Sequence, residues 1–305
     1  MSIPFIDLQA QRRRIASEIE RAVSAVVVGG QWIMGPQVRA LEEQLAEFAG
    51  VKHCVACANG TDALMIVLRA WNIGPGDAVF VPAFTFAASA EVVALVGATP
   101  VFVDVLEDTY NLDPRALETA IATVMGEGKL RPRAVMPVDL FGQAADYRGI
   151  EPIIAREGLK LLVDTAQAFG ATLDGRQTAA IGDAAGTSFF PAKPLGCYGD
   201  GGATFTNEDG LAELLRSIRI HGQGSDKYEN MRIGVNSRLD TIQAAILIEK
   251  LKIFPEEIEL RERVARRYTD AFRRSNRVRP PHVIEGAQST WAQYTVQVPD
   301  RDKLA

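Results

Sequence analysis

Residues 188–203 read SFFPAKPLGCYGDGGA. They place Lys193 in a stiff segment with a proline on either side, between an apolar run at residues 184–190 and a glycine-rich loop. This is an unusual position for a solvated surface charge. A partly desolvated amine loses its proton more easily, which makes Lys193 a candidate Schiff-base nucleophile. The loop matches neither the dinucleotide pattern G-x-G-x-x-G nor the triphosphate pattern G-x-x-x-x-G-K-[ST], so a nicotinamide oxidoreductase is disfavoured.

Upstream of this stretch, short apolar runs alternate with helical patterns. Strands are predicted at residues 53–58, 78–82, 99–103, 134–138 and 159–164, and helices are predicted to begin near Thr61, Phe86, Pro114 and Arg148. Apolar strands joined by helices indicate a mostly parallel sheet buried on both faces. Two later runs, at residues 184–190 and 203–206, follow glycine-rich connections and are predicted to be reversed strands that close the sheet. The predicted fold class is therefore α/β.

Helical patterns also flank the predicted sheet. One helix is predicted to end at Gly29-Gly30 and a second to run from Pro36 to Gly50. A long helix is predicted at residues 238–272, broken or kinked at Pro255. Alternation at residues 294–298 predicts a half-buried strand before a helix capped by Asp300, and the chain is expected to stop in mid-domain. The predicted units are an N-terminal helical segment (1–35), a large domain (36–245) and the incomplete start of a smaller C-terminal α+β domain (246–305).

The composition is that of a folded chain with a small-molecule partner. Of its 305 residues 47% are hydrophobic and 23% charged, and the net charge is −5. Because no long basic tract is present, a nucleic-acid or anionic-membrane partner is not expected. A secretory signal and a spanning apolar run are not recognised, so a cytoplasmic protein is predicted. Cys54, Cys57 and Cys197 suit a reducing compartment, and the single C-x-x-C is interpreted as packed strand residues with no metal site.

Two further candidate sites lie where predicted strands end. Residues 58–64, ANGTDAL, join a strand to a helix, and the free N–H groups there suit a phosphate, although this stretch taken alone favours an ordinary helix start capped by Thr61. Asp164 ends the strand at residues 159–164, where open α/β sheets bind ligands, although an N-cap is an alternative role. Gln167 is expected to share that face. Together, a phosphate cradle, an aspartate and a Schiff-base lysine are what pyridoxal 5'-phosphate (PLP) requires.

On these residues, the sequence resembles the sugar-nucleotide aminotransferases of the aspartate-aminotransferase-like, fold-type I PLP enzymes. The matching stretches cover most of the chain and are PFIDLQAQ, GPQVRALEEQLAEFAG, NGTDAL, PAFTFAASAE, PVFVDV, DTAQAFGA, SFFPAKPLGCYGDGGA and GVNSRLDTIQAAIL. The resemblance implies a large domain with a mostly parallel seven-stranded sheet, a smaller C-terminal domain, PLP as the cofactor and a homodimer with shared active sites. Thr165, where the family often has alanine, and Ala192, where serine is frequent, are small departures that remove no functional group.

The resemblance also implies roles for individual residues. Lys193 would hold the cofactor and then shuttle protons at the substrate carbon. The cofactor phosphate would be bound by Gly60, Thr61, the backbone of Asp62 and Ser188. Phe86 would stack on the pyridine ring, with a core aromatic at a helix start as the alternative. Asp164 would pair with the ring nitrogen and Gln167 would approach the ring hydroxyl. Asn236 would reach the phosphate of the neighbouring subunit.

Within this family, GCYGDGGA, HGQ and GVNSRLDT are most similar to enzymes that aminate C3 of a UDP-linked 2-acetamido-3-oxo-hexuronic acid, made for surface polysaccharides such as the lipopolysaccharide O-antigen. Arg238 would then pair with the sugar carboxylate, with a helix-start salt bridge to Asp240 as the alternative. His221 and Tyr294 are further candidates for sugar contacts. A dTDP- or GDP-linked keto-deoxysugar as substrate and a non-catalytic regulatory protein of this fold are the alternative functions. A sugar dehydratase is disfavoured because Lys193 stands where such relatives carry histidine.

Overall fold

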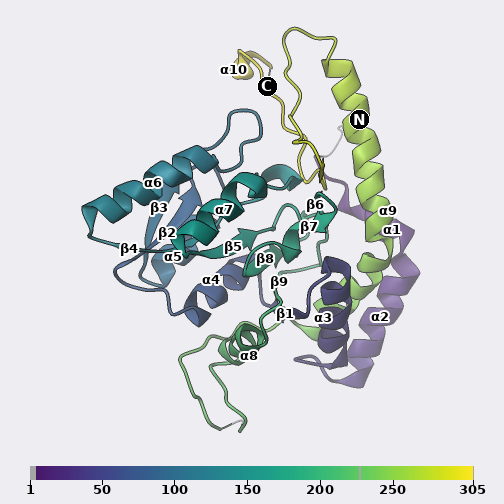
Figure 1. Ribbon diagram of the computed structural model, residues 1–305. Coiled ribbons are helices and arrows are strands. Elements are labelled where there is room, and N and C mark those ends of the chain that lie inside the picture. Colours follow the sequence, from purple (N-terminus) through teal and green to yellow (C-terminus); the bar gives the residue numbers. More distant parts are fainter. Residues whose placement is uncertain (1–4, 227, 305) are drawn as a thin grey trace.

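The computed structural model describes residues 5–226 and 228–304 and has a seven-stranded sheet at its centre (Figure 1). The strands are β1 (His53–Cys57), β2 (Asp77–Pro82), β3 (Thr99–Val103), β4 (Arg131–Val135), β5 (Lys160–Asp164), β8 (Ala184–Ser188) and β9 (Gly202–Thr206). Their order is β1-β9-β8-β5-β4-β2-β3, and β9 is antiparallel to both of its neighbours. The mostly parallel α/β sheet is confirmed. Of the two strands predicted to be reversed, β9 is, whereas β8 runs parallel to β5.

Helices cover both faces of the sheet, so its inner strands are largely buried on both sides, whereas the edge strand β3 is partly exposed. One face carries α4 (Gly60–Ala70), α5 (Ala88–Leu95) and α8 (Asp209–Ile218). The other carries α3 (Pro36–Ala49), α6 (Pro114–Glu127), α7 (Tyr147–Glu157) and α9 (Thr241–Phe272). Alternate residues of one strand enter different cores: Val79 and Val81 pack with α4 and α5, and Phe80 packs on the opposite face. This two-sided burial explains why the strands read as continuous apolar runs.

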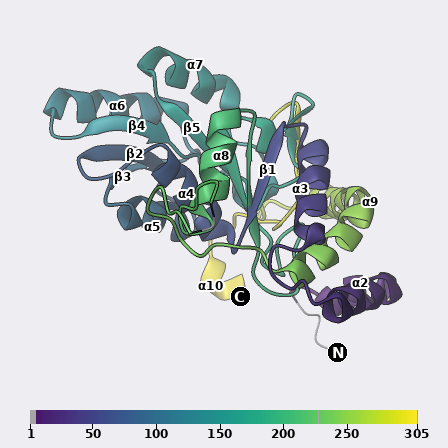
Figure 2. The same cartoon turned by 90° about the horizontal axis from the view of Figure 1, so that it is seen from below.

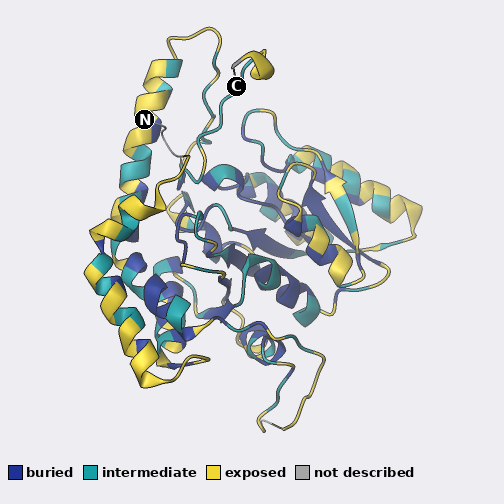
Figure 3. Ribbon diagram, turned by 180° about the vertical axis from the view of Figure 1, so that it is seen from behind, coloured by how far each residue is buried: buried dark blue, intermediate teal, exposed yellow. Residues whose placement is uncertain are grey.

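The N-terminal helices α1 (Leu8–Arg14) and α2 (Ala16–Gly29) lie beside α9 at the β1 end of the sheet (Figure 2). Ile15, Ile19 and Ile246 form a small core between them, and the outward surfaces of α2 and α9 are exposed (Figure 3). Pro255 lies inside α9, which is continuous from Thr241 to Phe272, so the predicted break there is wrong. Missing one N–H at Pro255 is not enough to end a helix that packs on α2 and α3.

The C-terminal part of the chain returns to the sheet domain. A three-stranded sheet joins β6 (Thr172–Leu173), β7 (Arg176–Gln177) and β10 (Ala287–Gln288), and α10 (Arg301–Leu304) follows Asp300 as predicted. Single turns of 3-10 helix lie at Leu140–Gly142 and Thr178–Ala180. The strand predicted at residues 294–298 does not form. Only Gln297 pairs there, in one isolated bridge with Arg279, because no neighbouring strand runs alongside.

Candidate active site

A cavity of about 440 Å³ opens at the carboxyl ends of β5 and β8. It brings together seven of the residues singled out from the sequence: Gly60, Thr61, Phe86, Asp164, Gln167, Ser188 and Lys193. Asn59, Thr85, Phe190 and Asp200 also line it and were not singled out. Of these, Asn59 carried a usable signal, because an asparagine just before a helix start is a common N-cap.

Asn59 is the N-cap of α4, and the Thr61 cap considered from the sequence is not formed. The Asn59 side chain accepts from the Asp62 N–H at 2.8 Å, which leaves the Asp62 amide engaged. Gly60 is required here because a Cβ on it would lie 2.5 Å from the Cβ of Ser188. The start of α4 therefore packs very closely on Ser188 at the end of β8, and both line the cavity, where the first amides of a helix suit an anion.

Asp164 is buried at the end of β5 and reaches the cavity. One carboxylate oxygen accepts from the Ala166 N–H at 3.0 Å and the other from the Ser89 hydroxyl at 3.2 Å. Burial raises the pKa of Asp164, while these hydrogen bonds and the charge of Lys193 act in the opposite direction. The Ala166 contact closes a turn, and no helix follows Asp164, so the N-cap role considered from the sequence is not formed, whereas the carboxylate does face the cavity.

Lys193 lies half-buried in the same cavity. Within residues 5–226 and 228–304, its ammonium group makes no hydrogen bond and no ion pair within contact distance. Burial lowers the pKa of Lys193, and the nearby Asp164 charge partly restores it. A primary amine without a partner, next to a buried carboxylate, is a group available for chemistry on a bound molecule.

Gln167 is held by hydrogen bonds from two other segments of the chain. Its side-chain oxygen accepts from the Phe141 N–H at 2.6 Å, and its backbone carbonyl accepts from the Thr290 hydroxyl at 3.0 Å. Phe86 is exposed at the mouth, with 69% of its surface accessible, so it is not the core aromatic considered as the alternative. The two hydrogen bonds orient Gln167. The exposed Phe86 ring is free to cover a ligand.

Besides Asp62, whose N–H is taken by Asn59, four predicted residues do not line the cavity formed by the single chain. Asn236 is exposed and pairs with Ile220 in an isolated bridge. Arg238 is half-buried and forms no ion pair with Asp240 or any other described acid. The exposed side chain of His221 lies on the loop that follows α8, and Tyr294 shares a 2.8 Å hydrogen bond with Thr269 of α9. The single chain therefore brings together seven of the predicted cofactor residues and leaves Asn236 and the predicted substrate residues apart from them.

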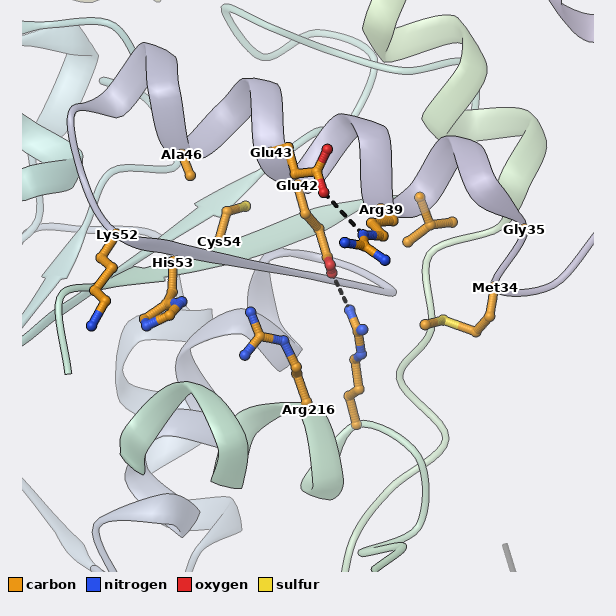
Figure 4. A pocket seen from close by; sticks show the side chains of 12 residues that line it. Met34, Gly35, Arg39, Glu42, Glu43, Ala46, Lys52, His53, Cys54 and Arg216 are labelled. Carbon is orange, nitrogen blue, oxygen red and sulfur yellow. Dashed lines mark hydrogen bonds and ion pairs between the residues drawn. The ribbon is translucent and has the colours of Figure 1, made fainter. Parts of the chain in front are cut away.

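A second cavity, of about 470 Å³, lies between α3, β1 and α8 at the free edge of β1 (Figure 4). Here Arg219 donates to Glu42 and, at 2.6 Å, to the carbonyl of Ala56, while Glu42 accepts from the Ala56 N–H at 2.9 Å. The pair thus satisfies both backbone groups of an edge residue, as a neighbouring strand would. None of the residues predicted for the site lines this cavity, so we take the cavity at β5 as the candidate site.

The cysteines do not form a metal centre with one another. Cys54 packs in the core on one face of the sheet and Cys57 in the core on the other, because they are an odd number of residues apart on one strand. Burial raises the pKa of Cys57 to about 12. Within the described residues, no group of three or more His, Cys, Asp or Glu side chains is placed to bind a metal ion. No helix in this part of the chain is long and apolar enough to cross a membrane.

The fold and the site together define an α/β enzyme of the PLP aminotransferase class, with a lysine and an aspartate meeting at the ends of sheet strands. More specifically, the chain belongs to the DegT/DnrJ/EryC1/StrS aminotransferase family, whose sequence profile matches residues 13–305.

Individual relatives agree with this assignment. The chain is 49% identical to the UDP-2-acetamido-2-deoxy-3-oxo-D-glucuronate aminotransferase of Pseudomonas aeruginosa, over 99% of this chain and 82% of the relative. It resembles the crystal structure of a DegT DnrJ EryC1 StrS aminotransferase from Brucella abortus with a TM-score of 0.97 and 54% identity, covering 99% of this chain and 81% of that one. NtdA from Bacillus subtilis with bound cofactor PMP superposes with a TM-score of 0.89 and 28% identity, covering 99% and 68%.

Proposed function

We propose that this protein is a PLP-dependent aminotransferase that moves an amino group from an amino acid, glutamate in the first instance, to the C3 keto group of a UDP-2-acetamido-3-oxo-hexuronic acid. The observation that carries the class is the unpartnered ammonium group of Lys193 beside buried Asp164 in one cavity. The substrate rests on the 49% identity to the P. aeruginosa enzyme. We place the reaction in the cytoplasm, in the synthesis of surface polysaccharides such as the lipopolysaccharide O-antigen.

The residues of the cavity fit PLP. The amine of Lys193 would hold the aldehyde carbon, and Asp164 would pair with the ring nitrogen. Gln167 would approach the ring hydroxyl, and exposed Phe86 would stack on the ring. The phosphate would lie at the start of α4, against Gly60, Thr61 and Ser188, whereas the Asp62 backbone, also predicted from the sequence, already donates its N–H to Asn59. When bound, PLP supplies a sink for the electron pair that is left when the substrate carbon loses its proton.

The chain's own residues would perform the proton transfers. Burial lowers the pKa of Lys193, which favours the neutral form that would accept a proton from the amino-bearing carbon of the donor. The same amine would return a proton at C3 of the sugar in the second half-reaction. Asp164 would keep its negative charge next to the cofactor ring through the hydrogen bonds from Ala166 and Ser89. The Asp164→Asn variant keeps the acceptor for Ala166 and removes that charge.

We further propose a homodimer in which residues outside the single-chain cavity complete the partner's site. Asn236 is exposed on the segment after α8 and would reach the partner's cofactor phosphate. Arg238, which has no acidic partner within the described chain, would pair with the uronic carboxylate of the sugar. His221 is exposed on the same segment and would contact the sugar, as would Tyr294. Each of these groups has a side chain able to bind a polar ligand.

The first test is chemical. The purified protein is reduced with borohydride in the presence of PLP and digested, and the pyridoxyl group is expected on Lys193. Its appearance on Lys160, which pairs with Asp183 at 2.6 Å, would refute the site. Turnover is then measured with glutamate and a panel of UDP-, dTDP- and GDP-linked keto sugars. Preference for a dTDP or GDP sugar would favour the alternative aminotransferase, and absence of turnover on every sugar would favour a regulatory protein.

The second test concerns the sugar carboxylate. The Arg238→Lys variant is compared on the 3-oxo-hexuronic acid nucleotide and on the matching sugar with a neutral C6. A lysine keeps the charge but loses the bidentate geometry, so kcat/KM should fall about tenfold or more on the acid alone. Equal losses on both sugars would assign Arg238 a structural role and leave the sugar unspecified.

A further inference from the structure

Lys250 is a buried lysine that the proposed reaction does not use. It lies on α9 with only 2% of its surface exposed, and its ammonium group donates to the backbone carbonyl of Gly196. The same ammonium lies 5.2 Å from the centre of the Tyr198 ring, within the range of a cation–π contact. Lysines are almost never fully buried without a specific partner. The partners of Lys250 are in the loop that follows Lys193, so this contact attaches the loop to α9.

The loop that receives this contact is a closed turn. Cys197 N–H donates to the carbonyl of Phe189, and Lys193 N–H donates to the carbonyl of Phe190, both at 2.8 Å. Gly196 packs so closely on this turn that a Cβ on it would lie 2.5 Å from the carbonyl oxygen of Pro191. The Gly196 carbonyl is therefore rigidly linked to the backbone that carries Lys193, and a group that fixes one fixes the other.

Helix α9 holds the turn at two points that share one helix face. Gln243 accepts from the Tyr198 N–H at 2.9 Å, and Lys250 follows seven residues later, two turns along the helix. Phe254, one turn further, is completely buried against Phe169. The face of α9 that contacts the turn thus carries the Gln243 amide and the Lys250 ammonium group, followed by the buried Phe254 ring.

We propose that Lys250 is a positioning residue for Lys193: by holding the Gly196 carbonyl from α9, its ammonium group fixes the turn that presents the Lys193 amine to Asp164. The inference rests on the proposed function only for the role of Lys193. The contact itself is a property of this chain, and it can be measured without substrate or cofactor.

The surroundings of Lys250 make the contact sensitive to pH. The charged and titratable groups that face it are Glu257 and Arg261 on α9 and Cys197 and Tyr198 in the loop. From α1, Glu257 accepts a hydrogen bond from the neutral Gln11 amide at 2.6 Å and forms an ion pair with Arg14 at 3.7 Å. Burial lowers the pKa of Lys250 to about 8, and Glu257 opposes that shift. The ammonium group is therefore charged at neutral pH and becomes a neutral amine as the pH rises through 8, which weakens both of its contacts.

Deuterium exchange of the full chain without PLP is the first test. In Lys250→Met, the amides of Lys193, Cys197 and Tyr198 should exchange about tenfold faster than in the wild type, because a charge-assisted hydrogen bond is lost. Amides of α6 should be unchanged. Lys252→Met is the matched control: this lysine lies two residues along α9, is exposed and pairs with Glu249 at 2.6 Å, so its loss should leave the turn unaffected.

Kinetics provides the second readout. Lys250→Met should lower kcat at least tenfold with little change in the KM for the amino donor, and Lys250→Arg, which keeps the charge, should recover part of the loss. The wild type should lose protection in the turn as the pH rises through about 8, after correction for intrinsic exchange, and Lys250→Met should not.

Unchanged exchange in the turn of Lys250→Met would overturn the proposal, as would equal effects of Lys250→Met and Lys252→Met. If Lys250→Met does not fold, the wild-type pH series decides: pH-independent protection of Lys193 and Cys197 rejects the role of the ammonium group. If the wild type turns over none of the sugars but the exchange rates of the variants change as expected, the result counts against the proposed reaction and not against this contact.

Discussion

Gly60→Ala should damage the candidate site by a steric route that the structure specifies. The added methyl group would lie 2.5 Å from the Cβ of Ser188 and 3.1 Å from its Cα and hydroxyl. Carbon atoms in contact are normally about 3.5–4 Å apart, so one element has to move by roughly 1 Å. Neither backbone moves freely, because a Cβ on Gly202 would itself lie 2.3 Å from the Asn59 carbonyl.

The expected magnitude follows from that overlap. Overpacking in a closely packed region costs about 1–3 kcal/mol, and replacing a helical glycine by alanine returns roughly 0.5–1 kcal/mol. The free energy of unfolding of Gly60→Ala should therefore fall by up to about 2.5 kcal/mol. The start of α4 and the Ser188 hydroxyl move apart in this variant, so PLP affinity should fall about tenfold or more, as expected for loss of about 1.4 kcal/mol of binding.

Urea unfolding and a spectroscopic PLP titration measure the two effects separately. Gly126→Ala is the matched control, because Gly126 lies in exposed α6 with nothing within 4 Å of its built Cβ. This change should stabilise the protein by about 0.5–1 kcal/mol without altering PLP affinity. Wild-type stability together with wild-type PLP affinity in Gly60→Ala would show that the contact between α4 and β8 yields easily, and the steric argument would fail.

Three other perturbations have expected outcomes. Asp164→Asn should retain PLP and its contact with Ala166 but slow the half-reaction with glutamate by orders of magnitude; stopped-flow spectra would reveal near-wild-type rates if the charge is dispensable. Arg219→Met should cost about 3–5 kcal/mol in urea unfolding, because it leaves the Glu42 carboxylate unpaired, whereas Arg216→Met in the same cavity should cost under about 1 kcal/mol. Burial raises the pKa of Asp139 to about 7. The folded state therefore holds a proton that the unfolded state releases, and stability should decline as the pH rises from about 4 to 7; an equally steep decline in Asp139→Asn would contradict this assignment.

Strands and helix starts were readable from the sequence because local rules and tertiary structure agree there. Thr99–Val103 matches its predicted bounds, and α6 begins at Pro114 after an Asp113 cap, as the residue types indicate. The strand predicted at residues 294–298 failed because alternation describes one strand, whereas a strand needs a neighbour to pair with. Similarly, Pro255 is tolerated because packing of α9 outweighs one missing hydrogen bond.

For the site, the sequence motifs identified residues that line the cavity but not the residues that position them through hydrogen bonds and ion pairs. Lys193 and Asp164 each carry a local signal, a stiff proline-flanked segment and a strand end. Ser89 does not, since its hydroxyl reaches Asp164 only because α5 packs on β2, β3 and α4. Glu42 and Arg219 are 177 residues apart and meet only at the edge of β1. Contacts of this kind depend on topology, which single-sequence patterns do not encode.

Gln167, in the wall of the cavity, is held by residues that lie far from it in the sequence. Gly142 has φ of +111°, and a Cβ on it would lie 2.8 Å from the backbone nitrogen of Trp291, so only glycine lets the two segments meet. Thr290 then donates from its N–H to the Gly142 carbonyl at 2.9 Å and from its hydroxyl to the Gln167 carbonyl. The turn thereby places the Phe141 N–H on the Gln167 side chain. A residue that follows α9 therefore fixes a side chain that follows β5, and the geometry of the candidate site depends on the C-terminal segment as well as on the sheet.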